Sequence, residues 1–151
     1  MGLALDEARA ALEHDDVPVG AIIVHNDVVI AARHNERELD DNPVGHAEML
    51  ALVDAAKKLG QWRLDECTMY VTLEPCAMCA GALVNSRLGR LVYAAHDQKA
   101  GAVNSQYDLL SGELLNHHVE VSTGLRAQES ADLLRAFFRA RRTRSSEVSE
   151  G

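Results

Sequence analysis

The sequence lacks the features that would place a protein in a membrane or outside the cell. It contains no uninterrupted apolar run of about 18 residues, the length at which a segment becomes a candidate membrane helix. Its first residues, MGLALDEARAALEHDD, carry acidic side chains and no basic stretch ahead of an apolar one, unlike a secretory signal peptide. We therefore expect no membrane segment and a cytoplasmic location.

Cysteine is scarce, and its number is odd. The three cysteines are Cys67, Cys76 and Cys79. An odd number in a chain with no export signal argues against a disulfide framework. Because Cys76 and Cys79 are three residues apart, metal binding and thiol redox chemistry are the two explanations for that pair.

Basic residues are fewer than acidic ones. The chain has 15 lysines and arginines against 23 acidic residues, a net charge of −8, which argues against a broad nucleic-acid-binding surface. Five of the 15 are arginines between positions 135 and 144. Arg135, Arg139 and Arg142 have i, i+4 and i+7 spacing and would share one helix face. This face is a candidate RNA contact, and an ordinary solvated helix face is the alternative.

The pattern of apolar residues predicts alternating strands and helices in one domain. We expect strands over 17–24, 28–33, 67–72, 89–95 and 118–121, and helices over 3–14, 46–59, 76–85, 107–110 and 128–142. Such alternation predicts a three-layer α/β/α sandwich around a mixed sheet of about five strands. Residues 35–45 predict a loop.

The two ends of the domain are also predicted from composition. Leu134 and Phe138 indicate the inward stripe of the last helix, and helix 76–85 is apolar nearly all round and should be buried. We expect the domain to cover residues 1–142 and a flexible polar tail to follow over 143–151.

Three residues form a candidate zinc site. Cys76 and Cys79 lie in the first turn of a predicted helix, where the helix N-terminus favours the thiolate form, and His46 begins another helix. Imidazole and two thiolates suit tetrahedral zinc and leave the fourth position for water, as in catalytic sites. Cys67 lies on the far side of a strand, so we expect it to be a small buried residue and not a fourth ligand.

Glu48 is the candidate catalytic residue. It follows His46 by two positions, and in the first turn of a helix both side chains can reach a pocket beyond the helix end. A carboxylate beside a zinc-activated water can act as the general base. A structural zinc site has no use for an unligated acid at this position, so Glu48 argues against a non-catalytic zinc-binding domain.

His46-Ala47-Glu48 and Pro75-Cys76-Ala77-Met78-Cys79 together resemble the signature of the zinc-dependent nucleobase deaminases. The resemblance implies a cytidine-deaminase-like fold and a hydrolytic reaction that removes an exocyclic amine from a base. It also implies one zinc ion per subunit on His46, Cys76 and Cys79, with proton transfer by Glu48.

Longer segments narrow this resemblance to one family. Bacterial tRNA-specific adenosine deaminases resemble the chain from about Leu5 to Arg142, through VPVGAIIV, HAEMLAL, YVTLEPCAMCAGALVNSRLGRLVYAA, DQKAGAVNS, LNHHVEV and LLRAFFRARR. That family converts the wobble adenosine of an arginine tRNA to inosine and works as homodimers. The resemblance therefore implies a tRNA anticodon loop as substrate and a second copy of the chain as partner.

The same resemblance implies polar contacts with the substrate. Asn35 matches a family asparagine that hydrogen-bonds the flipped nucleoside, and an Asx turn is its structural alternative. Asp97 matches an acidic position near the sugar, where a carboxylate can accept a hydrogen bond from the 2′-hydroxyl that DNA lacks. Lys99 would meet phosphate or be solvated.

Further matched positions have less specific roles. They are the apolar pocket residues Val19 and Leu73, the pocket wall at Glu74, and an anticodon-loop contact at Asn116 and His117. Plain core is the alternative for the apolar pair, and helix-terminal charge is the alternative for Glu74. His96 and Asn104 depart from the family, which often has Arg and Gly at these positions of the loop expected to touch RNA.

Two further activities stay open beside the tRNA reaction. A deaminase of a free base or nucleoside, such as guanine or cytosine, would carry the same signature. An engineered adenine deaminase acting on single-stranded DNA would carry it too. The sequence does not choose among these substrates without the longer resemblance.

Overall fold

A mixed five-stranded sheet organises the chain in the computed structural model, which describes residues 1–113 and 115–150. The strand order is β2-β1-β3-β4-β5; β1 is antiparallel to β2 and β3, whereas β3, β4 and β5 are parallel. The strands are β1 (Gly20–His25), β2 (Val28–His34), β3 (Cys67–Leu73), β4 (Arg90–Ala95) and β5 (Glu120–Thr123). Because β3 and β4 are parallel, both end at the same edge of the sheet.

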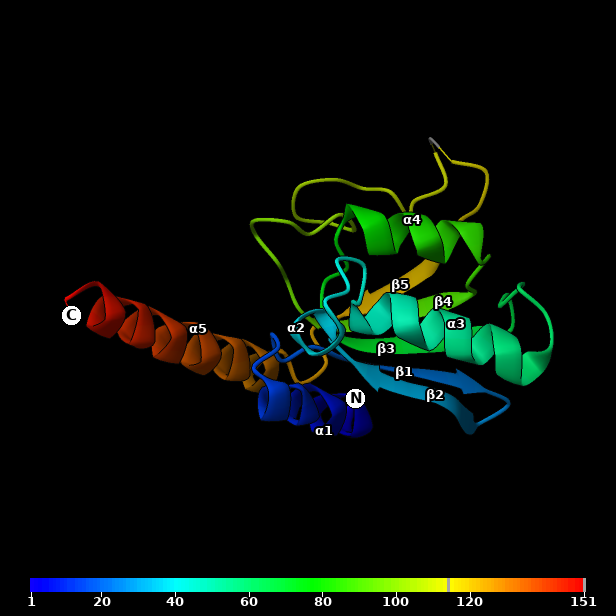
Figure 1. Cartoon of the computed structure of the whole chain (residues 1–151). Helices are drawn as coiled ribbons and strands as arrows, with labels where there is room; N and C mark the ends of the chain where they lie inside the picture. The colour runs from blue at the N-terminus through cyan, green and yellow to red at the C-terminus, as the bar shows by residue number, and fades with distance from the viewer. Residues whose placement is uncertain (114, 151) are drawn as a thin grey trace.

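Helices cover both faces of this sheet (Figure 1). One face carries α3 (Ala47–Leu59) and α4 (Ala77–Asn85); the other carries α1 (Gly2–Ala11), which continues into the 3₁₀ turn η1 (Leu12–His14), and α5 (Ala127–Ser149). The predicted three-layer α/β/α sandwich is confirmed. A single-turn helix, α2 (Arg37–Asp40), lies within the predicted loop 35–45. Over residues 1–113 and 115–150, no helix is both long and apolar enough to cross a membrane.

The hairpin of β1 and β2 forms as predicted. Asn26 and Asp27 between the strands both have positive φ, 50° and 61°, which is the backbone of a two-residue turn that matches strand twist. At the start of β1, helix α1 passes so close that a Cβ on Gly20 would lie 2.0 Å from the carbonyl oxygen of Ala4. Glycine at this position therefore lets α1 pack directly on the sheet.

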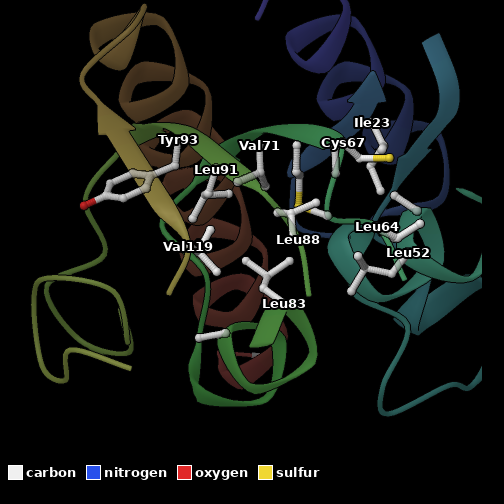
Figure 2. Close-up of a cluster of buried hydrophobic side chains, with 14 of the residues drawn as sticks. Ile23, Leu52, Leu64, Cys67, Val71, Leu83, Leu88, Leu91, Tyr93 and Val119 are labelled. Carbon is white, nitrogen blue, oxygen red and sulfur yellow. The ribbon is translucent and has the colours of Figure 1, made fainter. Parts of the chain in front are cut away.

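The main core lies between the sheet and the layer formed by α3 and α4. Figure 2 shows its larger side chains, which are Ile23, Leu52, Leu64, Cys67, Val71, Leu83, Leu88, Leu91, Tyr93 and Val119. Cys67 is 2% exposed, and burial raises the pKa of its thiol. The expectation that Cys67 is a small buried residue is confirmed.

Of the two elements predicted after β4, the helix is absent and the strand is shifted by two residues. No helix forms over 107–110, because the amides of Tyr107 and Leu109 bond to the carbonyls of Gly101 and Ala102 and not to residues one helical turn back. The last strand begins at Glu120 and not at 118, since the amide of Val119 bonds to Leu110 and not to β4.

Helix α5 is longer than predicted. It continues past Arg142 to Ser149, because the segment contains no Pro or Gly that would stop it. The hydroxyls of Thr143 and Ser145 donate to the carbonyls of Arg139 and Arg141, four residues back. The predicted helix end is therefore wrong, whereas the flexibility of this segment stays a prediction.

Candidate active site at the ends of β3 and β4

The potential zinc ligands lie at the edge of the sheet where β3 and β4 end. His46 is the N-cap of α3 and Cys76 is the N-cap of α4, both with extended backbone. Ser, Thr, Asp and Asn are preferred at an N-cap because their side chains accept hydrogen bonds from the first helical amides. Neither His46 nor Cys76 caps its own helix, so the imidazole and the thiol are available to each other.

The three ligand atoms have the spacing that zinc requires. His46 Nδ1 lies 3.6 Å from Cys76 Sγ and 3.5 Å from Cys79 Sγ. All three atoms lie within 4.8 Å of one another. A tetrahedral zinc ion with Zn–N of about 2.0 Å and Zn–S of about 2.3 Å separates nitrogen from sulfur by about 3.5 Å. These residues therefore fit a zinc ion.

The pKa values of the two thiols are shifted in opposite directions. A hydrogen bond from Cys79, aided by His46, lowers the pKa of Cys76 to about 3. The same hydrogen bond raises the pKa of Cys79, because a second thiolate would place two negative charges side by side. A divalent cation removes that repulsion, so zinc binding would displace the Cys79 proton.

Glu48 lies beside this group in the first turn of α3. Its side chain is buried, and burial raises the pKa of its carboxyl group. A carboxyl group with a raised pKa takes up a proton more readily, and a general acid–base must take up and return one.

Asn35 holds the start of α3 in place of an N-cap side chain. Its Oδ1 accepts a hydrogen bond from the amide of Ala47 at 2.8 Å, twelve residues away, so the bond is not a local Asx turn. Because an amide side chain also carries a donor, this leaves Nδ2 available at the pocket that Asn35 lines.

A pocket of about 710 Å³ opens at the ligand group. Ligand pockets commonly measure about 300–1,000 Å³, so this one has room for a nucleoside. The residues that were predicted from the sequence and line it are Val19, Asn35, His46, Glu48, Leu73, Glu74, Cys76, Asp97, Lys99, Arg135, Arg139 and Arg142. Cys79 is fully buried.

Comparison with known proteins identifies the family. The sequence model of the MafB19-like deaminases matches residues 1–142. The tRNA-specific adenosine deaminase of Agrobacterium fabrum (strain C58) is 48% identical over 94% of this chain and 93% of its own length. The corresponding enzyme of Bacillus subtilis (strain 168) is 47% identical over 90% of this chain and 84% of its own length. The chain belongs to the family of tRNA-specific adenosine deaminases.

Solved structures agree with this assignment. A chain from a study of A-to-I editing by tRNA:A34 deaminases superimposes on this deaminase with a TM-score of 0.85 at 44% identity, covering 89% of this chain and 97% of that one. A guanine deaminase from Nitrosomonas europaea superimposes with a TM-score of 0.79 at 29% identity. The match covers 90% of this chain and 81% of that one. The fold is therefore shared with a protein named for a different base.

Two residues of the predicted site do not reach the pocket of the deaminase. His117 Nε2 lies 2.8 Å from the carbonyl oxygen of Leu88, which precedes β4, and Asn116 is its exposed neighbour. The pocket lies at the other end of β4, and at about 3.3 Å per residue the strand spans about 17 Å. In a single chain the structure therefore does not bring Asn116 and His117 to the zinc ligands.

Several pocket residues of the deaminase were missed or misplaced by the sequence patterns, and Phe138 is one of them. Adjacent residues on a helix point about 100° apart, so only one of two neighbouring phenylalanines can face the sheet. Phe137 is the inward one at 6% exposed, whereas Phe138 is 41% exposed and lines the pocket. The assignment of Phe138 to the inward stripe is wrong. Arg37 and Gln98 also line the pocket, and their polar loops carry no periodicity that could have indicated it.

Proposed function

We propose that this deaminase converts adenosine to inosine at the wobble position of a tRNA anticodon loop, with an arginine tRNA as substrate. The observation that carries the proposal is the meeting of the His46–Cys76–Cys79 group, the buried Glu48 and the α5 arginines around one pocket. The relatives named for the tRNA reaction are 41–48% identical, against 29% for the guanine deaminase, which favours the RNA substrate over a free base.

The reaction is hydrolytic, and this chain supplies the proton transfers. His46, Cys76 and Cys79 would hold one zinc ion per chain, which when bound lowers the pKa of water to about 7 and so supplies the nucleophile. Glu48 takes a proton from the water, delivers it to the ring nitrogen beside the reacting carbon, and then assists departure of the amine. The amine leaves as ammonia, and the oxygen of the water becomes the carbonyl oxygen of inosine.

Two kinds of contact would orient the base. Asn35 offers Nδ2 as a donor, because its Oδ1 is already occupied by the amide of Ala47. Val19 and Leu73 supply apolar contact at the pocket wall. A base held by one donor between apolar surfaces presents its amine to the proton carrier, Glu48.

Basic residues at the pocket rim would bind the RNA backbone. Arg135, Arg139 and Arg142 of α5 line the pocket, as does Lys99. Arg135 is partly neutralised by Asp132 at 2.6 Å, whereas Arg139 and Arg142 make no ion pair with any residue in the described part of the chain. An anticodon loop is already partly unstacked, so extruding one base costs little and a small basic footprint is sufficient despite the net charge of −8.

Asp97 would recognise the sugar with one of its two oxygens. Oδ1 accepts hydrogen bonds from the amides of Lys99 and Ala100, each at 3.1 Å, and so shapes the local turn. Oδ2 remains to accept a hydrogen bond from a 2′-hydroxyl, which favours RNA over DNA.

A homodimer in the cytoplasm is part of the proposal. Helix α4 is apolar nearly all round, yet Ala77, Met78, Gly81 and Ala82 are at least partly exposed, and a second copy would cover this face. A Cβ on Gly81 would meet nothing within 4 Å, so Gly81→Arg should leave the chain folded and halve the mass in light scattering. A Gly81→Arg protein that stays dimeric would move the interface to another surface.

The test of the proposed function is deamination of an arginine-tRNA anticodon stem-loop by the zinc-loaded protein. The DNA counterpart, free adenosine, guanine and cytosine are assayed in parallel, and Glu48→Ala is the inactive control. We expect inosine in the RNA alone. Turnover of guanine or cytosine without inosine in RNA would replace the proposal by a free-base deaminase.

A further inference from the structure

One wall of the pocket is a loop without regular secondary structure, residues 97–105. Asp97, Gln98 and Lys99 of this 97–105 loop line the pocket. The inner side of the loop meets the carboxylate of Glu74, whose side chain is 0% exposed. The position of this wall is therefore decided by contacts with Glu74 and not by a strand or helix ladder.

The carboxylate of Glu74 accepts five hydrogen bonds from the 97–105 loop. Oε2 accepts from the amides of Val103, Asn104 and Ser105 at 3.2, 2.9 and 2.9 Å. Oε1 accepts from the amide of Asp97 at 3.1 Å and from the hydroxyl of Ser105. Burial alone would raise the pKa of Glu74, but these hydrogen bonds outweigh burial and lower the pKa to about 2. Both oxygens of the anchor therefore accept hydrogen bonds from the loop.

Gly101 lies where the loop backbone crosses this carboxylate. A Cβ at position 101 would be 2.3 Å from Cδ and from Oε2 of Glu74. Any larger residue would push the loop and the carboxylate apart. The close approach of Gly101 is thus a second, independent sign that the loop rests directly on Glu74.

The anchor belongs to the segment that carries a zinc ligand. Glu74 precedes Pro75 and Cys76, and the amide of Ala102 donates to the carbonyl of Pro75 at 2.8 Å. The substrate wall and the start of α4 are therefore tied together within three residues. A shift of the 97–105 loop would change the distance between this pocket wall and Cys76.

We propose that Glu74 is a positioning residue, whose buried carboxylate holds the 97–105 loop, and with it Asp97 and Lys99, at the distance from Cys76 that the RNA substrate requires. It does not touch the substrate. The inference rests on the proposed function, because the wall is taken to contact RNA. It differs from the role expected from the sequence, in which Glu74 itself forms the wall.

The decisive variant is Glu74→Gln, which keeps the shape but replaces one acceptor oxygen by an NH₂ group that faces backbone donors. We expect KM for the stem-loop to rise about tenfold or more, with kcat changed less than about threefold and zinc content unchanged. Glu66→Gln is the matched control. This substitution removes the same charge, and Glu66 is 82% exposed. Gly101→Ala displaces the loop with the carboxylate intact and should reproduce the KM effect.

Three outcomes would overturn the inference. Wild-type KM in both Glu74→Gln and Gly101→Ala would show that the wall needs no anchor. A loss of thermal stability with KM unchanged would make Glu74 a residue of the fold alone. If the wild-type protein does not deaminate RNA, hydrogen exchange still decides: the amides of Asn104 and Ser105 should exchange faster in Glu74→Gln and not in Glu66→Gln, and equal rates would reject the anchor.

Discussion

Glu48 and Glu74 border the same pocket and both are buried, yet their pKa values move in opposite directions. For Glu48, burial is the largest influence and prevails over contacts with its own amide and with His46, so the pKa rises. For Glu74, burial is opposed by the hydroxyl of Ser105 and by backbone amides, and the pKa falls to about 2. The number of donors that face each carboxylate decides the sign.

This difference separates two uses of one residue type. A buried carboxylate with few donors exchanges its proton easily and suits acid–base chemistry. A buried carboxylate surrounded by donors stays charged and behaves as a fixed attachment point for backbone. The same Glu→Gln substitution at the two positions should therefore produce different kinetic defects.

The largest effect is expected for Glu48→Gln. The variant cannot carry protons, so kcat should fall by about 10³-fold or more while zinc content and RNA affinity stay near wild type. Single-turnover inosine formation and elemental analysis measure the two quantities. Turnover within tenfold of wild type would remove Glu48 from the proton-transfer role and end the contrast with Glu74.

His46→Ala changes the surroundings of Glu48 and leaves those of Glu74 intact. We expect zinc to fall from about one per chain to a small fraction, because two thiolates alone bind weakly. His118→Ala, at an exposed histidine, is the control and should keep its metal. Full zinc occupancy in His46→Ala would exclude His46 from the ligand set.

The arginines of α5 test binding without touching either glutamate. The triple change of Arg135, Arg139 and Arg142 to Ala should weaken stem-loop binding and make the logarithmic salt slope shallower by about 2. Lys57 and Lys58 in the last turn of α3, with Arg63 just after it, form an exposed control set at the other end of that helix. If affinity and slope match the control triple, α5 is a solvated helix and not an RNA contact.

The smallest effect is a pH dependence specific to Glu74. Its folded-state pKa of about 2 lies below the ordinary 4.5, so its stabilising contribution is complete above the unfolded value and disappears as pH falls toward about 2. In zinc-free protein, the Tm difference between wild type and Glu74→Gln should be constant near neutral pH and shrink below about pH 4.5. A difference that does not change down to about pH 3 would contradict the lowered pKa.

The sequence predicted the strands, the starts of the long helices and the residues of the candidate metal group because each leaves a local pattern. Cys76 and Cys79 stand three apart behind Pro75, and His46 and Glu48 open an amphipathic segment. The role of Glu74 left no such pattern, since its partners are backbone amides 23 to 31 residues away. Main-chain donors are present at every residue except proline and carry no signal in the side-chain sequence.

The remaining differences between prediction and structure depend on tertiary contacts that the sequence pattern does not show. Phe137 and Phe138 are equally apolar, and the orientation of α5 against β4 determines which of the two is buried. The resemblance implies Gly where this chain has Asn104, but the φ of Asn104 is not positive, so the backbone does not require glycine there. His117 was expected near the anticodon, and its bond to Leu88 holds it at the opposite edge of the sheet.

A wall held through its own main chain leaves its outward side chains free to vary. The amide bonds to Glu74 do not involve the side chains of Gln98 and Lys99, which are both exposed on the pocket side. Substitutions at these two positions can therefore change the surface that meets a substrate without moving it. The 97–105 loop is accordingly the part of the pocket where substrate preference can drift, or be redesigned, at little risk to the fold.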